Sequence, residues 1–143
     1  MKKLLVLGAG TAGTMVVNRL SRLLDRDEWQ ITIVDQHETH YYQPGFLFIP
    51  FGMYQEKDIV KPKNNFIPLG VNFVINKIDK IVAAENKVLM QDGEAYHYDI
   101  LIIATGTVVN PEETPGLKGD LWYKNIFDFY TPKGAIALQK FFK

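Results

Sequence analysis

Residues 4–13 read LLVLGAGTAG, and this stretch decides the fold of the chain. The four apolar residues that open it are typical of a parallel strand covered on both faces. A complete G-x-G-x-x-G motif follows, and then apolar residues at helical spacing over residues 14–24. The β-branched residues 31–34 predict a second strand. Strand, glycine-rich turn, helix and strand in this order predict a βαβ unit with a right-handed crossover.

Each glycine of the motif has a physical role in binding a dinucleotide. Gly8 permits the tight turn, Gly10 lets a pyrophosphate approach the backbone, and Gly13 lets the helix pack closely on the strand. The start of the helix offers free N–H groups and the positive end of its dipole. The motif alone also fits a purely structural turn. We favour dinucleotide binding because strand, helix and a downstream acid stand where this function needs them.

The acid is Asp35, about 20 residues after the glycine motif, at the end of the second predicted strand. A carboxylate at this place accepts hydrogen bonds from the ribose hydroxyls of adenosine, and it would repel a 2′-phosphate. Without the glycines, a solvated turn aspartate would be the preferred interpretation. With them, Asp35 is the predicted ribose-binding residue.

The rest of the chain predicts more strands and one further helix. The prolines and glycines of residues 36–70 predict loops and short helical turns. Alternating, hairpin-linked stretches predict an antiparallel β-meander over about residues 78–98, with Asp92-Gly93 as its clearest turn. Thr131-Pro132 predicts the start of a helix that runs to residue 142. The remaining strands are predicted at residues 71–75 and 100–103.

A second motif, YDILIIATG at residues 98–106, is a buried strand that ends in small residues. Small residues let the backbone come close to a ligand at the carboxyl edge of the sheet, where open α/β folds bind. Together the two motifs predict an α/β chain in which both buried strands, residues 4–7 and 100–103, belong to one parallel sheet. A structure with these strands in different sheets would contradict the prediction.

Composition excludes several classes of protein. The 143 residues are 47% hydrophobic and 22% charged, which is typical of a globular protein. The 16 basic and 16 acidic residues cancel, so no net field attracts nucleic acid. The absence of cysteine excludes disulfides and thiolate sites within these residues. His37 and His40 have no carboxylate cluster beside them, so we expect no metal site.

The cellular location of the protein can be judged from two apolar stretches, residues 1–7 and the loop at residues 46–51. The apolar run at the start is too short for a signal peptide, and no stretch is long enough for a transmembrane helix. We therefore expect a cytoplasmic protein. Phe46 to Phe51 is unusually apolar for a loop. Burial is its favoured interpretation, while contact with a quinone, a membrane surface or a second copy of the chain stays an alternative.

The glycine motif, Asp35, the meander and the strand ending in Ala-Thr-Gly resemble the FAD domain of the two-dinucleotide-domain flavoproteins. The loop YYQPGFLF at residues 41–48, with Asp99 before the second motif, is most similar to sulfide:quinone oxidoreductases and type II NADH dehydrogenases. The resemblance implies a Rossmann-like three-layer FAD/NAD(P)-binding domain with FAD as cofactor. It implies that electrons pass from sulfide or NAD(P)H through FAD to a quinone.

The resemblance also implies which residues hold FAD. The glycine motif would bind the pyrophosphate and Asp35 the ribose, while the backbone at Lys77 and Ile78 would border the adenine. Gln43 and Pro44 would lie near the flavin ring, and the Ala-Thr-Gly motif would flank the cofactor. The predicted cofactor-binding residues are Gly8, Gly10, Thr11, Ala12, Gly13, Asp35, Gln36, Gln43, Pro44, Lys77, Ile78, Ala104, Thr105 and Gly106.

The chain departs from the resembled family in one respect. Sulfide-oxidising enzymes use redox cysteines, one of them commonly after the Ala-Thr-Gly strand, where this chain has KNIFD at residues 124–128. No catalytic residue is therefore assigned. Residues 1–116 are predicted to be the FAD-binding domain, and residues 117–143 a linker and the start of a second domain that is truncated, so that the chain alone is inactive. An NAD-linked dehydrogenase and a non-catalytic dinucleotide-binding fragment stay as alternatives.

Overall fold

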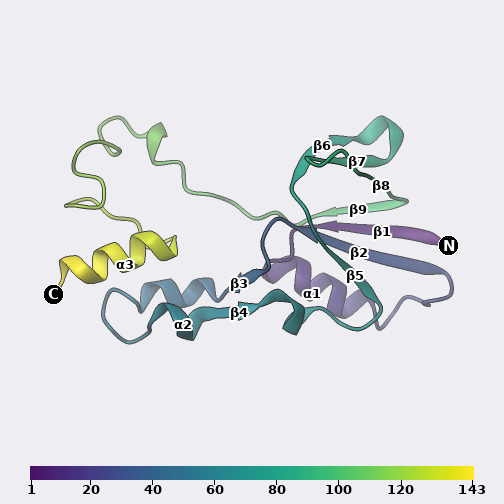
Figure 1. Cartoon of the computed structure of the whole chain (residues 1–143), viewed down its shortest axis with the longest axis horizontal. Coiled ribbons are helices and arrows are strands. Elements are labelled where there is room, and N and C mark those ends of the chain that lie inside the picture. Colours follow the sequence, from purple (N-terminus) through teal and green to yellow (C-terminus); the bar gives the residue numbers. More distant parts are fainter. The chain divides into compact units, whose positions relative to one another are not determined.

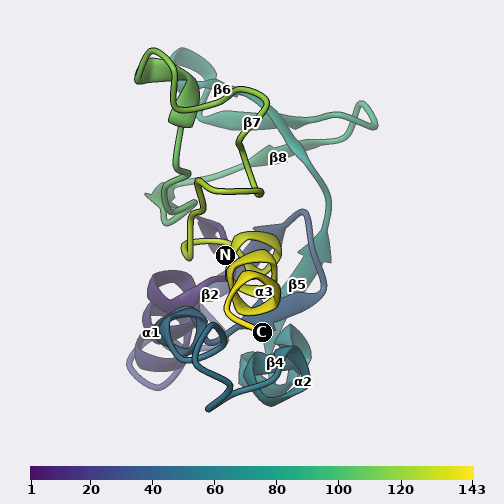
Figure 2. The same cartoon turned by 90° about the vertical axis from the view of Figure 1, so that its left-hand side faces the viewer.

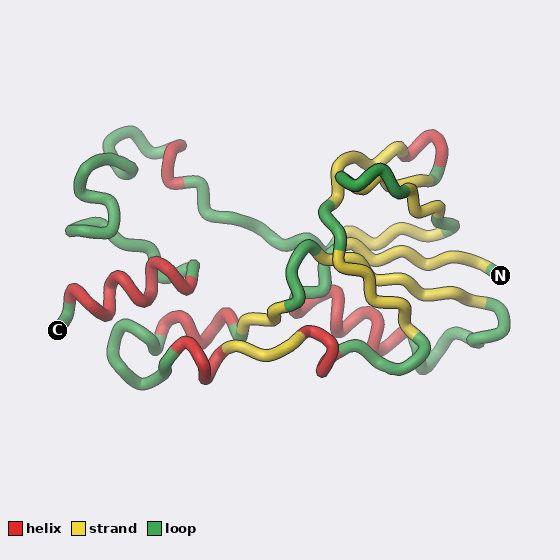
Figure 3. The backbone as a smooth tube through the Cα atoms, in the orientation of Figure 1, coloured by secondary structure: helices red, strands yellow, loops and turns green.

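The computed structural model describes residues 1–143, which form two compact units. The first unit comprises residues 1–40 and 61–106, and the second comprises residues 41–60 and 107–143. Figure 3 shows that the strands gather in the first unit, whereas the second is built mostly of short helices and loops. The predicted domain boundary at residue 116 stays a prediction.

A four-stranded parallel sheet forms the centre of the first unit (Figure 1). Its strands, in spatial order, are β5 (Val71–Ile75), β2 (Trp29–Asp35), β1 (Lys2–Leu7) and β9 (Ile100–Ile103). In the register of the sheet, Leu4 lies between Ile31 of β2 and Ile100 of β9. The prediction that residues 4–7 and 100–103 share one parallel sheet is confirmed.

Two different layers cover the two faces of this sheet (Figures 1 and 2). Helix α1 (Thr11–Leu20) lies on one face, where Val17 packs with Leu4 and Val6 of β1. The antiparallel strands β6 (Ile78–Val82), β7 (Lys87–Met90) and β8 (Ala95–His97) cover the other face. There Val88 packs with Leu5, a β1 residue that faces away from α1. Since successive residues of β1 face opposite layers and both layers are apolar, the buried residues 4–7 of the strand are all apolar, whereas Lys2 and Lys3 before them are exposed.

The predicted fold class, a three-layer Rossmann-like α/β domain with a small β-meander, is confirmed. The bounds and the buried face of α1 differ from the prediction. The helix begins at Thr11, inside the glycine motif, and ends at Leu20, beyond which Leu23 is exposed. Met15, one of the apolar residues at helical spacing in residues 14–24, is 68% exposed. The residues of α1 that are buried are Gly13, Thr14 and Val17, and Met15 lies on the opposite side of the helix from Val17.

Residues 36–70 form short elements, as predicted, together with one small sheet that was not. The short helices are η1 (Gln43–Leu47), α2 (Glu56–Ile59) and η2 (Lys63–Phe66). The strands β3 (Thr39–Tyr41) and β4 (Val60–Pro62) pair with each other. Each has three residues, too few to show an alternating pattern in the sequence. A further turn, η3 (Ala83–Glu85), joins β6 and β7, and Asn86 after it is left-handed.

The second unit has its own small core around the helix α3 (Pro132–Phe141). Ala135 of this helix packs with Phe46, Ile49 and Ile59. The predicted capping is confirmed, since the Thr131 side chain accepts a hydrogen bond of 3.0 Å from the Gly134 N–H. The apolar loop at residues 46–51 is thus partly buried, but Phe51 at its end is 70% exposed. The remaining element of this unit is η4 (Pro111–Glu113).

Candidate nucleotide-binding site

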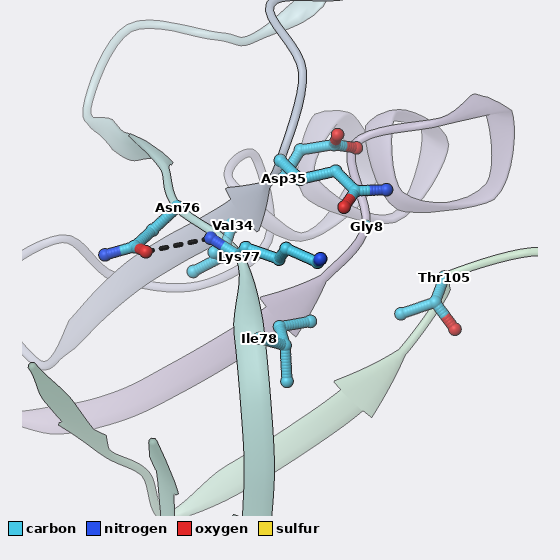
Figure 4. Close-up of a pocket in the computed structure, with 8 residues that line it drawn as sticks. Gly8, Val34, Asp35, Asn76, Lys77, Ile78 and Thr105 are labelled. Carbon is cyan, nitrogen blue, oxygen red and sulfur yellow. Dashed lines mark hydrogen bonds between the residues drawn. The ribbon is translucent and has the colours of Figure 1, made fainter. Parts of the chain in front are cut away.

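A pocket of about 180 Å³ opens at the carboxyl edge of the parallel sheet, within the first unit (Figure 4). Residues that follow each of the four strands line it or lie beside it, as expected for a ligand site of an open α/β sheet. In Figure 4, Asp35 at the end of β2 and Lys77 shortly after β5 lie at neighbouring strand ends. The lining residues are Gly8, Val34, Asp35, Gln36, Asn76, Lys77, Ile78 and Thr105.

The three motif glycines differ in what a side chain at each would meet. Gly8 has a positive φ of 97°, and a Cβ there would overlap the carbonyl oxygen of Ala104. A Cβ at Gly13 would overlap the carbonyl oxygen of Gly8. At Gly10, by contrast, no atom lies within 4 Å of an ideal Cβ, and φ is an ordinary −77°. Folding thus requires glycine at two positions, whereas the open space at Gly10 is available to a ligand.

The first turn of α1 is suited to an anion. Gly10 is its N-cap, no side chain caps this end, and no acidic residue lies in the first turn. The first intrahelical hydrogen bond of this end runs from the Thr14 N–H to the Gly10 carbonyl, at 3.0 Å. The N–H groups of Thr11, Ala12 and Gly13 precede it, at the positive end of the helix dipole. This arrangement fits the pyrophosphate of a dinucleotide.

Asp35 is held by three donors. Its Oδ2 accepts a hydrogen bond of 2.7 Å from the Ala9 N–H, inside the glycine motif. Its Oδ1 accepts one of 2.9 Å from the His37 N–H and forms an ion pair of 2.6 Å with Lys63 Nζ. Burial raises the pKa of Asp35, but Lys63 and the two N–H donors outweigh this effect and hold the pKa below its ordinary value. Asp35 is therefore an ionised acceptor at neutral pH.

The depressed pKa of Asp35 predicts a loss of stability in acid. The contribution of Asp35 is complete above its unfolded pKa, about 3.9, and is lost as pH falls through the lower folded pKa. We expect the free energy of unfolding to drop over this window, measured by urea denaturation at a series of pH values. Lys63→Met removes the largest cause of the lowered pKa, so the drop should be smaller in that protein. An identical pH dependence in both proteins would contradict the prediction.

The other side of the pocket is suited to a flat ring. Asn76, directly after β5, accepts a hydrogen bond of 2.8 Å from the Lys77 N–H and donates one of 2.6 Å to Asp92. These bonds fix the backbone where β5 passes into β6. Ile78 presents an apolar surface beside this turn and packs on the meander side of the sheet. The predicted adenine-bordering residues, Lys77 and Ile78, therefore line the pocket.

His40 lies close enough to the Asp35–Lys63 ion pair for both charges to act on its ring. Its ring packs on that of Phe66, with 4.7 Å between the ring centroids, and its buried Nδ1 has no hydrogen-bond partner. Burial and the nearby Lys63 charge lower the pKa of His40, so the ring is neutral at neutral pH. The structure contains no group of three or more histidine or acidic side chains placed to hold a metal ion.

The structure brings most of the predicted site residues together in the first unit. Gly8, Asp35, Gln36, Lys77, Ile78 and Thr105 line the pocket, and the rest of the glycine motif, with Ala104 and Gly106, adjoins them in the chain. Gln43 and Pro44 begin η1 in the second unit, so their place near a flavin ring stays a prediction. Sequence reasoning missed Val34, Asn76, His40 and Lys63. Val34 and Asn76 stand at ends of parallel strands, a signal that could have revealed them.

Comparison with known proteins identifies the family. The model of the pyridine nucleotide-disulphide oxidoreductase family matches residues 2–140, so the chain belongs to this family. Over 141 residues the chain is 31% identical to the mitochondrial sulfide:quinone oxidoreductase of Dictyostelium discoideum, covering 99% of this chain and 31% of that protein. Over 119 residues it is 34% identical to a type II NADH:quinone oxidoreductase of Staphylococcus aureus, covering 82% of this chain and 29% of that protein.

A solved structure shows the same fold. The sulfide:quinone oxidoreductase from Aquifex aeolicus superposes on 98% of this chain with a TM-score of 0.78 at 26% identity, covering 31% of that enzyme. The chain spans about a third of the length of the relatives it matches. The predicted resemblance is confirmed, and the family that the chain belongs to is a family of oxidoreductases. None of the helices combines the length and the hydropathy needed to cross a bilayer.

The family is FAD-dependent, and the residues of the pocket fit the ADP portion of FAD. The space at Gly10 and the uncapped start of α1 suit its pyrophosphate, and Asp35 suits its ribose. Sites for whole cofactors usually have volumes of about 300–1,000 Å³, so this pocket of about 180 Å³ fits only part of one. The adenosine end is the part whose chemistry the lining residues match.

Proposed function

We propose that this chain supplies the FAD-binding part of an oxidoreductase that passes electrons from sulfide or NAD(P)H to a quinone. The observation that carries the proposal is the open space at Gly10 between two glycines that the fold itself requires. A glycine that no packing explains, at the start of an uncapped helix, indicates a ligand that approaches the backbone. Membership of the flavoprotein family supports FAD as that ligand.

Each part of the pocket has a role in holding the cofactor. The first N–H groups of α1 would donate to the pyrophosphate, and Asp35 would accept from a ribose hydroxyl. Ile78 would pack on one face of the adenine, and Asn76 would fix the turn that places it. When bound, FAD supplies the ring that accepts and donates electrons, while the protein holds and orients it.

In the second unit, three polar side chains support a role for the predicted flavin loop. Thr107 and Tyr130 form a hydrogen bond of 3.0 Å between their hydroxyls. Hydrogen bonds with Thr107 and Gln43 lower the pKa of the Tyr130 phenol. We propose that this cluster holds Gln43 and Pro44 in the orientation that a flavin ring would meet. Its members come from segments far apart in the sequence, so the contact is a product of folding.

The choice of electron donor and acceptor follows from the relatives' names, one acting with sulfide and one with NADH, and both with quinone. Several apolar side chains at and just after the loop of residues 46–51 are exposed: Leu47 by 51%, Phe51 by 70% and Met53 by 67%. Such a surface favours contact with an apolar acceptor, a second copy of the chain or a membrane surface. Sulfide, NADH and NADPH should be tested anaerobically with the flavin-loaded oxidoreductase that contains this chain as its FAD-binding part. Bleaching of the flavin absorption identifies the donor, and its return on adding a quinone identifies the acceptor.

The two alternatives make different predictions for cofactor binding. A soluble NAD-linked dehydrogenase would bind NAD more tightly than FAD, although both contain the ADP portion. A non-catalytic fragment would bind ADP and FAD without any donor reducing the flavin. Calorimetric titration with ADP, FAD and NAD separates these outcomes. The proposal requires FAD to bind at least as well as ADP and better than NAD, and the reverse order would contradict it.

Asp35→Asn tests the ribose contact. One acceptor oxygen remains after the change, so we expect a partial loss of about 1–3 kcal/mol in ADP binding, typical of a hydrogen bond to a charged group. The change also leaves Lys63 without its counter-charge, so binding must be compared at a temperature where both proteins are folded. Asp79→Asn, at an exposed site in β6, is the matched control and should bind ADP normally. Unchanged affinity in Asp35→Asn would remove the ribose role.

A further inference from the structure

Lys63 is the charged residue whose placement most needs an explanation. It begins η2, and only 6% of its surface is exposed, the lowest exposure of any charged residue in the chain. Burying an ammonium group costs several kcal/mol unless an opposite charge and hydrogen bonds compensate. Its ion-pair partner is Asp35, at 2.6 Å, with side-chain exposures of 7% for Lys63 and 13% for Asp35. Burial is not a property of this segment as a whole, because Lys61, two residues earlier, is exposed.

The contacts of the Asp35 carboxylate show what Lys63 does there. Oδ1 is occupied by two donors, the His37 N–H and the Lys63 ammonium. Oδ2 has one donor, the Ala9 N–H of the glycine motif. A carboxylate has about four acceptor positions, so one remains, and it is on Oδ2. Lys63 therefore leaves the oxygen that is tied to the glycine motif as the one available to a ligand.

Lys63 acts through Asp35 and not on a ligand directly. Asp35 lines the pocket, whereas Lys63 does not. The backbone fixes Lys63 behind the carboxylate, because its N–H donates a hydrogen bond of 2.7 Å to the Glu38 carbonyl, just after β2. His40 faces the same ion pair but is neutral at neutral pH, so it cannot replace the charge of Lys63.

We propose that Lys63 is a positioning residue that fixes the Asp35 carboxylate so that its Oδ2 accepts a single ribose hydroxyl of an adenosine diphosphate group. This inference rests on the proposed function. Its consequence is that the ribose is recognised by one hydrogen bond to Asp35 and not by a carboxylate gripping both hydroxyls. The same ion pair couples ribose recognition to the glycine motif, because Oδ2 is also the acceptor of the Ala9 N–H.

The test is ADP binding by the 143-residue chain, measured by calorimetry over a pH series. We expect Lys63→Met to bind ADP about 10-fold more weakly at neutral pH, the loss of about one charged hydrogen bond. Without Lys63, burial raises the pKa of Asp35, so the affinity should also begin to fall at a higher pH than in the parent. Lys63→Arg keeps the charge and should restore most of the affinity. Lys61→Met, at the exposed neighbour, should match the parent.

A double variant separates positioning from a merely structural role. Asp35→Asn combined with Lys63→Met leaves no unpaired buried charge, so it should fold even where Lys63→Met alone does not. The proposal requires this double variant to bind ADP as Asp35→Asn does, within about 3-fold. A further 10-fold loss would overturn it, as would a folded Lys63→Met with the affinity and pH profile of the parent. If the parent protein does not bind ADP, the proposed function is contradicted, and this inference, which rests on it, is contradicted as well.

Discussion

Gly10→Val is expected to abolish binding of FAD and ADP while leaving the fold intact. Apart from its neighbours in the chain, no protein atom lies within 4 Å of an ideal Cβ at this position, so the fold leaves room for a side chain. The backbone is equally permissive, because its φ of −77° and ψ of −161° suit a β-branched residue. The side chain would instead occupy the space above the N–H groups of the first turn of α1. That space is the one that a pyrophosphate needs.

The expected magnitude of the Gly10→Val effect is a loss of affinity of about 100-fold or more, or about 2.7 kcal/mol. The cost in stability should be about 1 kcal/mol, because valine is a poorer N-cap than glycine. Calorimetry with ADP measures the first quantity and thermal unfolding the second. Gly119→Val is a suitable control, since Gly119 also has open space around its Cβ position but lies in the second unit. Normal ADP affinity in folded Gly10→Val would mean that the glycine motif is structural only.

The parts of the site that could be predicted from the sequence are those whose signals are local. An uninterrupted apolar strand reports burial on both faces, and Leu4 to Leu7 do pack against α1 and the meander in turn. Glycines report backbone geometry, as Gly8 does with its positive φ. Asp35 was found because it directly follows a strand. In each case the feature is caused by a few residues that are adjacent in the sequence.

Lys63 could not have been predicted, because its cause is not local. The segment around it is polar, and a lysine there is normally solvated. Its burial depends on β3 and β4 bringing residue 63 back to the end of β2, and those three-residue strands have no sequence signal. Met15 of α1 is the opposite case, an apolar residue that the structure leaves exposed. The apolar spacing of residues 14–24 indicated a helix, but small residues of the glycine motif, Gly13 and Thr14, are buried against the sheet, and Met15 is exposed.

Gly13→Ala is expected to destabilise the first unit rather than to weaken binding selectively. An ideal Cβ at Gly13 would overlap the carbonyl oxygen of Gly8, which is backbone and cannot move aside by changing a rotamer. Relief requires α1 to move away from β1, and that movement would open the core that Val17 forms with Leu4. Overpacking typically costs about 1–3 kcal/mol, and a clash between helix and strand backbones belongs at the upper end of that range.

The measurement for Gly13→Ala is the midpoint of thermal unfolding, and the expected decrease is about 10 °C. Gly10→Ala is the matched control, because it adds the same methyl group three residues earlier, where no atom lies within 4 Å. Alanine is the better helix former, so propensity alone would make Gly13→Ala more stable by about 1 kcal/mol. The sign of the change therefore decides between the two effects. A midpoint equal to or above that of the parent would show that α1 does not pack on Gly8 as closely as the structure indicates.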